Sequence, residues 1–172
     1  MNCAVINNMS MKLFDERLLD DLVAQAKASP RLRANHNVHE NLEDPVQRLF
    51  IAIEPGSYVQ PHRHPEAEKW EFFMVVRGRL AALLFDGWGK LLRREELLPG
   101  GPVYGFEIPP STWHCVVAME SGSVFFEVKQ GPYSPLDDKD FAAWSPREGA
   151  PGCAEFVSWL AMAQVGDLSP IV

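Results

Sequence analysis

Residues 56–78 read Gly-Ser-Tyr-Val-Gln-Pro-His-Arg-His-Pro-Glu-Ala-Glu-Lys-Trp-Glu-Phe-Phe-Met-Val-Val-Arg-Gly, with histidines at 62 and 64 and a glutamate at 71. In an extended chain, side chains two residues apart project to the same side, so His62 and His64 can reach one point. Glu71 begins a run of aromatic and β-branched residues that predicts a strand. Imidazoles and a carboxylate in this arrangement are typical ligands of a divalent transition metal.

A third histidine, His114, begins a later predicted strand, directly after a Pro-Pro-Ser-Thr-Trp turn. The ligand set lacks thiolates, which excludes a cysteine-based structural zinc knot and suits Fe(II), Mn(II), Ni(II), Cu(II) or Zn(II). Glu68 is a rival for the carboxylate position, but Glu71 lies where a strand would hold it rigidly. We therefore predict one divalent transition metal (Fe, Mn, Ni or Zn) held by His62, His64, Glu71 and His114.

The metal motif lies in a region of short strands separated by turn signals. Asp86-Gly87 is a strong hairpin signal, and Pro109-Pro110 breaks the pattern again. Seven or eight strands with no helix between them indicate an antiparallel sandwich or barrel. The predicted strands are Val46–Ile53, Glu71–Val76, Leu80–Phe85, Lys90–Leu92, Val103–Ile108, Trp113–Ala118 and Ser123–Lys129.

Helices are expected at both ends of this β-region. Apolar residues between Leu18 and Ala26 recur at helical spacing after Asp15, a good N-cap, and Ser29-Pro30 ends the helix. A short helix is expected around residues 140–144 and an amphipathic one over residues 156–163. The chain then reads as one domain with an N-terminal helix and polar loop (1–45), a β-barrel core (46–130) and a C-terminal helical appendage (131–172).

Composition limits the partners. The 172 residues include 16 basic and 23 acidic side chains, and a net charge of −7 argues against nucleic acid. No apolar run is long enough to span a membrane, and no signal peptide is visible. The three cysteines show no Cys-x-x-Cys spacing, which fits a reducing compartment. We expect a cytoplasmic protein whose partner is a small molecule.

Two motifs resemble those of the cupin superfamily: Gly56-x5-His62-x-His64-x6-Glu71-x6-Gly78 and Pro109-x-Ser111-x2-His114. The chain departs from the general pattern in the longer interval between His64 and Glu71, in Ser111 in place of glycine, and in Ala118 in place of asparagine. From about Ser29 to Gly149 the chain looks more specifically like the WbuC-type cupin metalloproteins. This likeness rests on Ser-Pro-Arg-Leu-Arg-Ala (29–34), Asp-Pro-Val-Gln-Arg (44–48), Glu-Pro-Gly-Ser-Tyr-Val (54–59), Pro-His-Arg-His (61–64), Trp-Glu (70–71), Trp-His (113–114) and Phe-Glu-Val-Lys-Gln-Gly-Pro-Tyr (126–133).

The resemblance implies an all-β double-stranded β-helix (cupin jelly roll) with N-terminal and C-terminal helices. It also implies a role in surface-polysaccharide (O-antigen) synthesis, with a sugar or nucleotide-sugar as substrate, and by analogy a homodimer. The leading hypothesis is a metal-dependent enzyme that acts on a small polar metabolite. The alternatives are a non-catalytic metal-dependent binding or sensor module and a metal-dependent dioxygenase.

Four residues are candidates for the substrate pocket. Strand alternation places Tyr58 and Gln60 on the side of His62, unless Pro61 twists the chain. Tyr58 could offer a proton or could be a core residue with its hydroxyl at the rim. Asn37 and His39 lie in a polar stretch that reads either as a solvated loop or, by the resemblance, as a flap over the barrel mouth. Tyr58 and His39 are thus the candidate catalytic residues.

Two charged residues in the last predicted strand, Glu127 and Lys129, have no clear assignment from the sequence. Either could line the pocket, but an exposed strand face or a cross-strand ion pair is the more common explanation.

Overall fold

The computed structural model describes residues 11–136 and 140–171, and Cys3 lies outside these ranges. Helix α1 spans Glu16–Ala28 and helix α2 spans Cys153–Met162. The strands are β1 (Arg33–Asn37), β2 (Val46–Ile53), β3 (Glu71–Arg77), β4 (Leu80–Phe85), β5 (Leu91–Leu97), β6 (Gly105–Ile108), β7 (Trp113–Ala118) and β8 (Ser123–Gln130). Neither helix has both the length and the apolar character needed to cross a bilayer.

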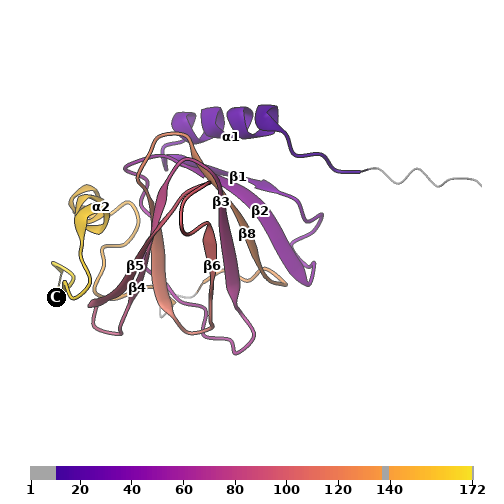
Figure 1. Cartoon of the computed structure of the whole chain (residues 1–172). Helices are drawn as coiled ribbons and strands as arrows, with labels where there is room; N and C mark the ends of the chain where they lie inside the picture. The colour runs from indigo at the N-terminus through magenta and orange to yellow at the C-terminus, as the bar shows by residue number, and fades with distance from the viewer. Residues whose placement is uncertain (1–10, 137–139, 172) are drawn as a thin grey trace, which may run out of the picture.

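The strands form two antiparallel sheets (Figure 1). One sheet has five strands in the order β1-β2-β8-β3-β6, and the other has three in the order β5-β4-β7. The chain changes sheet four times, from β3 to β4 and at each connection from β5 to β8, as in a rolled-up antiparallel ribbon. The prediction of an all-β double-stranded β-helix with helices at both ends is confirmed.

Strand alternation sorts the apolar side chains into three layers. One face of the five-stranded sheet, with Phe50 and Val124, packs against α1. Its other face meets the three-stranded sheet, where Phe73 and Phe125 contact Val116 and its neighbours. The far face of the three-stranded sheet packs against α2. The interior between the sheets is thus flanked on both sides by helix-covered faces.

The ends of α1 follow the local sequence signals. The backbone N–H of Leu18 donates to the Asp15 carboxylate at 3.0 Å, which satisfies one of the amides that have no partner inside the helix. The helix ends at Ser29, just before Pro30, as predicted. Leu22, Val23 and Ala26 are its buried residues. This amphipathic face is what holds α1 on the sheet.

Two elements differ from the sequence expectations. Residues 33–37, part of the expected polar loop, form β1, which pairs with β2 along its whole length. The sequence of β1 lacks the alternating apolar residues that predict a strand, because its inward face lines a polar cavity. Among the described residues, 141–144 do not form the expected helix, since the backbone there pairs with the His62 segment: the N–H of Ala142 donates to the carbonyl of Pro61 at 2.8 Å.

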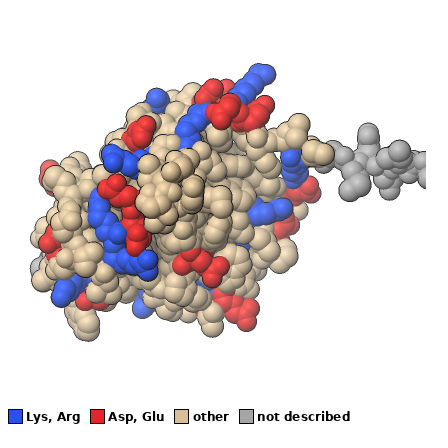
Figure 2. All heavy atoms as spheres, viewed as in Figure 1, with Lys and Arg blue, Asp and Glu red and all other residues tan. Residues whose placement is uncertain are grey.

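The surface carries both signs of charge. On the face in Figure 2, basic and acidic side chains lie next to one another. Strand β5 contributes to this mixture, because Arg93 pairs with Glu95 on the same strand and Glu96 pairs with Arg79. Exposed pairs of this kind contribute little to stability.

One group of ion pairs joins the segment after α1 to the segment before α2. Arg31 donates two hydrogen bonds of 2.8 Å to the Glu148 carboxylate, and Arg33 donates one of 2.7 Å. Burial raises the pKa of Glu148, but the Arg31 hydrogen bonds and the Arg33 charge outweigh it, so the pKa lies below its usual value. A carboxyl with a lowered folded pKa stabilises the fold above its unfolded pKa and loses this contribution as the pH falls through the folded pKa.

We therefore expect Glu148→Gln to lower the free energy of unfolding at neutral pH by less than about 1 kcal/mol, because the partly exposed pairs are screened by water. The difference from the wild type should shrink as the pH falls below about 4.5 and then vanish. Urea unfolding at several pH values measures it, with Glu96→Gln as the surface control. A deficit that stayed constant down to acid pH would show that Glu148 does not stabilise the fold through its charge.

Candidate metal centre

The four predicted ligands come from different parts of the fold and meet where the two sheets approach each other. Glu71 is the first residue of β3 in the five-stranded sheet, and His114 lies in β7 of the three-stranded sheet. His62 and His64 lie in the segment between β2 and β3. Backbone hydrogen bonds of 3.0 and 2.9 Å pair His62 with His114 and fix that segment on β7.

We call these four residues the His-Glu cluster. One potential ligand atom from each of them lies within 4.8 Å of the other three. Nε2 of His64 is 3.1 Å from one Glu71 carboxylate oxygen, and Nε2 of His114 is 2.9 Å from the other. Atoms that bind one ion at about 2.1 Å lie roughly 3 Å apart when they subtend a right angle at it. The spacing therefore suits a shared ion.

Neighbouring carbonyl groups orient two of the imidazoles. Nδ1 of His62 lies 2.9 Å from the carbonyl oxygen of Gln60, and Nδ1 of His114 lies 2.9 Å from that of Thr112. A carbonyl oxygen only accepts, so each Nδ1 donates its proton there. In the neutral rings this leaves Nε2 with a free lone pair, which is the usual arrangement for histidines that bind metals.

The charges in the cluster depend strongly on burial. Burial, followed by the nearby His114, lowers the pKa of His62 to about 3, so this ring is neutral near pH 7. Burial would raise the pKa of Glu71, but His114 and His64 hold it well below its usual range. Burial lowers the pKa of His114, but Glu71 more than compensates and raises it above its ordinary value. Glu71 is therefore a buried carboxylate that stays ionised because His114, His64 and Lys129 lie beside it.

Three buried atoms of the cluster fit a metal better than they fit one another. Nε2 of His64, Nε2 of His114 and one oxygen of Glu71 are buried and form no hydrogen bond among the described residues, although the two nitrogens lie 3.1 and 2.9 Å from the Glu71 carboxylate. Buried polar atoms without partners are rare and call for an explanation. A divalent ion bound by these atoms would supply it, and the nitrogen and oxygen donors suit a transition metal.

The rival carboxylate, Glu68, lies elsewhere. Its side chain is exposed and accepts a 3.3 Å hydrogen bond from the side-chain amide of Gln130. The structure thus places Glu71, and not Glu68, with the three histidines.

Two cavities open beside the cluster. The outer cavity, of about 410 Å³, contains His62, His64 and Glu71 and is lined further by Trp70 and Tyr133. The barrel cavity, of about 250 Å³, lies between the sheets. Its lining includes His62, Glu71 and His114 together with Phe73, Val116, Arg31 and Arg33. A ligand could therefore reach the cluster from either cavity.

Glu127 and Lys129 face the cluster, which resolves their ambiguity in the sequence. Lys129 pairs with Glu71 in the β8–β3 register, and its Nζ lies 3.4 Å from the Glu71 carboxylate and 2.6 Å from that of Glu127. Burial raises the pKa of Glu127. Burial lowers the pKa of Lys129, but Glu127 and Glu71 raise it above its ordinary value. Glu127 and Lys129 lie two and four residues after the buried Phe125, so alternation along β8 could have indicated that they point inward.

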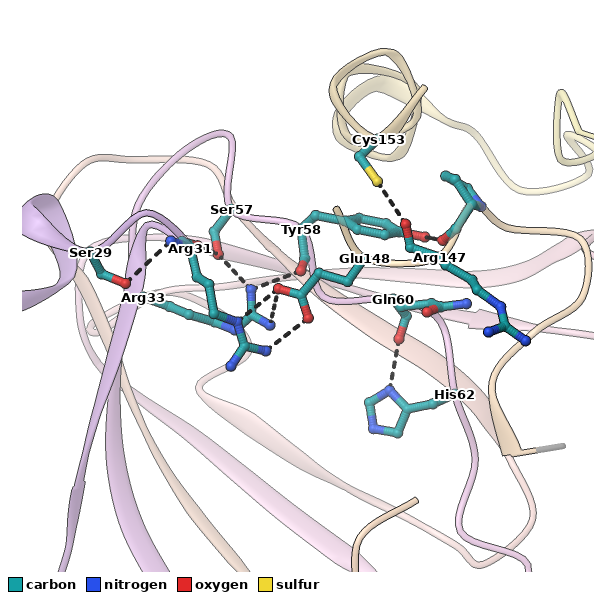
Figure 3. A network of polar contacts seen from close by, with 11 residues as sticks. Ser29, Arg31, Arg33, Ser57, Tyr58, Gln60, His62, Arg147, Glu148 and Cys153 are labelled. Carbon is teal, nitrogen blue, oxygen red and sulfur yellow. Dashed lines mark hydrogen bonds and ion pairs between the residues drawn. The ribbon is translucent and has the colours of Figure 1, made fainter. Parts of the chain in front are cut away.

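Tyr58 and Gln60 lie away from both cavities that contain the cluster. The hydroxyl of Tyr58 donates to the carbonyl of Pro146 at 2.7 Å, and its ring packs on Phe156 of α2. The Gln60 side chain donates to the Ser145 hydroxyl at 3.3 Å. Only the backbone carbonyl of Gln60 contacts His62 (Figure 3). Alternation fails because this segment belongs to no strand. Of these two candidates, neither side chain reaches the metal position.

His39 and Asn37 lie beside a separate cavity of about 370 Å³, which also contains Asn35 and Lys129. Nδ1 of His39 accepts from the backbone N–H of Arg48 at 3.0 Å, while its buried Nε2 has no partner among the described residues. Asn37 accepts a 2.9 Å hydrogen bond from Asn35. Lys129 lines this cavity and both cavities of the cluster, so it is the link between them.

Sequence comparison finds one family model that is similar to part of the chain. A family described as a domain of unknown function (DUF6016) matches residues 14–97, just under half of the chain. A search of curated proteins found no match.

Several solved structures are similar to this chain. KdgF from Halomonas sp. is 21% identical over 64% of this chain and 86% of that one, with a TM-score of 0.46. A cupin 2 domain-containing protein from Halorhodospira halophila is 24% identical over 63% and 72%, with a TM-score of 0.44. Oxalate oxidase in complex with the substrate analogue glycolate is 20% identical over 62% and 56%, with a TM-score of 0.48. Similarity at this level transfers no activity.

We expect His62→Ala and His114→Ala each to abolish stoichiometric metal binding, because each removes one of the few protein ligands. Unfolding should remain cooperative, since the sheets pack through apolar layers that do not need the ion. Elemental analysis of protein purified without a nickel column, combined with thermal unfolding, measures both.

Glu71→Gln and Glu68→Gln form a matched pair for the carboxylate. The first should lower metal affinity by about tenfold or more, and the second should leave it unchanged. A full metal equivalent in either histidine variant, or the reverse order of the two glutamine variants, would refute this ligand set.

Proposed function

We propose that this protein binds one divalent transition metal at the His-Glu cluster and acts on a small polar metabolite in the cytoplasm. The observation that carries the proposal is the convergence of four donors at a point that borders two cavities. A purely structural ion needs no such access. The motif resemblance to WbuC-type cupins supports a sugar or nucleotide-sugar of surface-polysaccharide synthesis as the metabolite, and a homodimer as the assembly.

The ligand count supports a reactive rather than a closed site. Iron, manganese and nickel accept more than four ligands, so four protein ligands leave coordination positions for a substrate oxygen. When bound, such an ion supplies Lewis-acid polarisation of that oxygen. Zinc with the same four ligands would be closed, and the site would then be structural.

Glu127 and Lys129 support an enzyme. They lie on the same face of β8, adjacent to Glu71, and both line the barrel cavity. A carboxyl and an amine 2.6 Å apart can exchange a proton with a substrate held against the cluster. In this proposal they take the acid–base role for which the sequence favoured Tyr58 and His39.

The position of Tyr58 and His39 supports the second candidate, a binding or sensor module. Neither side chain approaches the cluster. If Glu127 also takes no part in proton transfer, the site has no acid–base group and would bind its ligand without converting it. Turnover separates the two candidates. Metal identity addresses the third, a dioxygenase, which requires a redox-active ion.

For the enzyme, we expect metal-loaded protein to convert at least one member of a panel of sugars, sugar acids and nucleotide-sugars, followed by NMR. Glu127→Gln should then lower kcat by about 10²-fold or more, which is typical of losing an acid–base group. Its metal content should equal that of the wild type.

The matched control is Glu107→Gln, an exposed glutamate in the middle of β6, which should change neither quantity. Metal-dependent binding without any product would favour the binding module. Undiminished turnover in Glu127→Gln would remove Glu127 from the mechanism.

A further inference from the structure

The barrel cavity connects the His-Glu cluster with two arginines. Its lining includes Arg31 and Arg33 as well as His62, Glu71 and His114. Arg33 is the first residue of β1, and Arg31 lies just before that strand. The cavity therefore has metal-binding groups in one part of its wall and guanidinium groups in another, although the chain as a whole carries a net charge of −7.

Arg33 is held in a fixed position. Its Nη1 donates to the backbone carbonyl of Tyr58 at 2.8 Å and to the Ser57 hydroxyl at 3.3 Å. Only 16% of its side chain is exposed. Ser57 in turn donates to the backbone carbonyl of Arg31 at 2.8 Å, which ties the two arginine positions together. Nη1 of Arg33 is thus held by these hydrogen bonds, and Nη2 is left to donate to a carboxylate.

That anion is the carboxylate of Glu148. Arg31 binds it through two parallel hydrogen bonds, and Arg33 adds a third to the same group (Figure 3). Two guanidinium groups that converge on one carboxylate are the usual way in which proteins recognise a carboxylate or phosphate. The Glu148 carboxylate lines a neighbouring cavity, together with Gln60 and Trp113, so the two guanidinium groups lie between that cavity and the barrel cavity. Glu148 occupies the place that an oxyanion of a ligand would take at this boundary.

The turn that carries Glu148 lies at the surface, next to open space. Gly149 and Gly152 both have positive φ angles, and a Cβ atom at either position would meet nothing within 4 Å. The carboxylate itself is 36% exposed, so it is open to solvent exchange. An external oxyanion that displaced it would release Glu148 to water at little cost in packing.

We propose that Arg31 and Arg33 form an oxyanion subsite at the edge of the barrel cavity, and that Glu148 is its exchangeable internal counterion. The subsite takes the carboxylate or phosphate of the substrate, while the opposite end of the substrate lies at the His-Glu cluster. The orientation of the substrate toward the His-Glu cluster rests on the proposed function. Together the two proposals make the metabolite an anionic sugar derivative, either a sugar acid or a sugar phosphate.

The test uses inorganic phosphate and acetate as separate probes, titrated into the wild type and Glu148→Gln. NMR cross-peaks of the arginine Nε–H groups report binding. Glu148→Gln should bind at least one of the anions about tenfold more tightly, because the internal competitor has lost its charge. Stronger gain for phosphate indicates a sugar phosphate, and stronger gain for acetate indicates a sugar acid.

Adding Arg33→Gln or the more exposed Arg31→Gln to Glu148→Gln should abolish the gain in anion affinity. If one of these double variants does not fold, the other still provides the test. Glu96→Gln, which frees Arg79 of a surface ion pair, is the control and should give no gain. Equal anion affinity in wild type and Glu148→Gln, or a gain that survives in the double variants, would overturn the subsite.

Metal content of the same variants separates the two proposals. If metal binds at the cluster but Glu148→Gln gives no gain, only the subsite fails. If the gain appears in protein that binds no metal, the subsite stands and the proposed function fails.

Discussion

The buried carboxylate of Glu71 is the constraint on which the functional end of this fold depends. The residue is 3% exposed, and an isolated carboxylate in such a place is costly. The structure surrounds it with cationic or potentially cationic groups: His64 and His114 contact its two oxygens, and Lys129 lies 3.4 Å away. Replacing a whole buried charged group of this kind with apolar residues is often neutral or stabilising, so its retention is consistent with a bound ligand.

The architecture explains why these groups can meet. Glu71 and Lys129 face each other because β3 and β8 are paired in that register. His114 comes from the other sheet, and its backbone pairing with His62 brings the motif segment across. A one-residue slip in either pairing would turn a ligand to the opposite face. The apolar layers on both sides fix these registers, so packing energy is what organises the polar centre.

Most of the fold could be read from the sequence because its signals are local. Each of the seven predicted strands overlaps an observed one, although Lys90–Leu92 covers only the start of β5 (Leu91–Leu97). Alternation correctly places Phe73 with Glu71 and Val116 with His114. The convergence of the four donors was predicted from the spacing of His62 and His64 and from the positions of Glu71 and His114 at the starts of predicted strands. Ser29-Pro30 and Asp15 set the limits of α1 through backbone sterics and capping, which need no tertiary information.

The failures occur where position depends on non-local pairing. Tyr58 and Gln60 were assigned by alternation, but their segment is held by contacts with residues 145–146, which no local pattern reveals. β1 reads as a loop because an edge strand facing a polar cavity has no apolar stripe. The orientation of Lys129 required the strand register. The Arg31–Glu148 contact joins residues 117 positions apart.

The central claim is that three imidazoles and one carboxylate bind a single ion. X-ray absorption spectroscopy of the protein as purified, without added metal and without a nickel column, tests it most directly. The account predicts one metal per chain with three imidazole nitrogens and at least one carboxylate oxygen at about 2.1 Å. A metal-free protein that also fails to take up Fe(II), Mn(II), Ni(II) or Zn(II), or a first shell without imidazole, would contradict it.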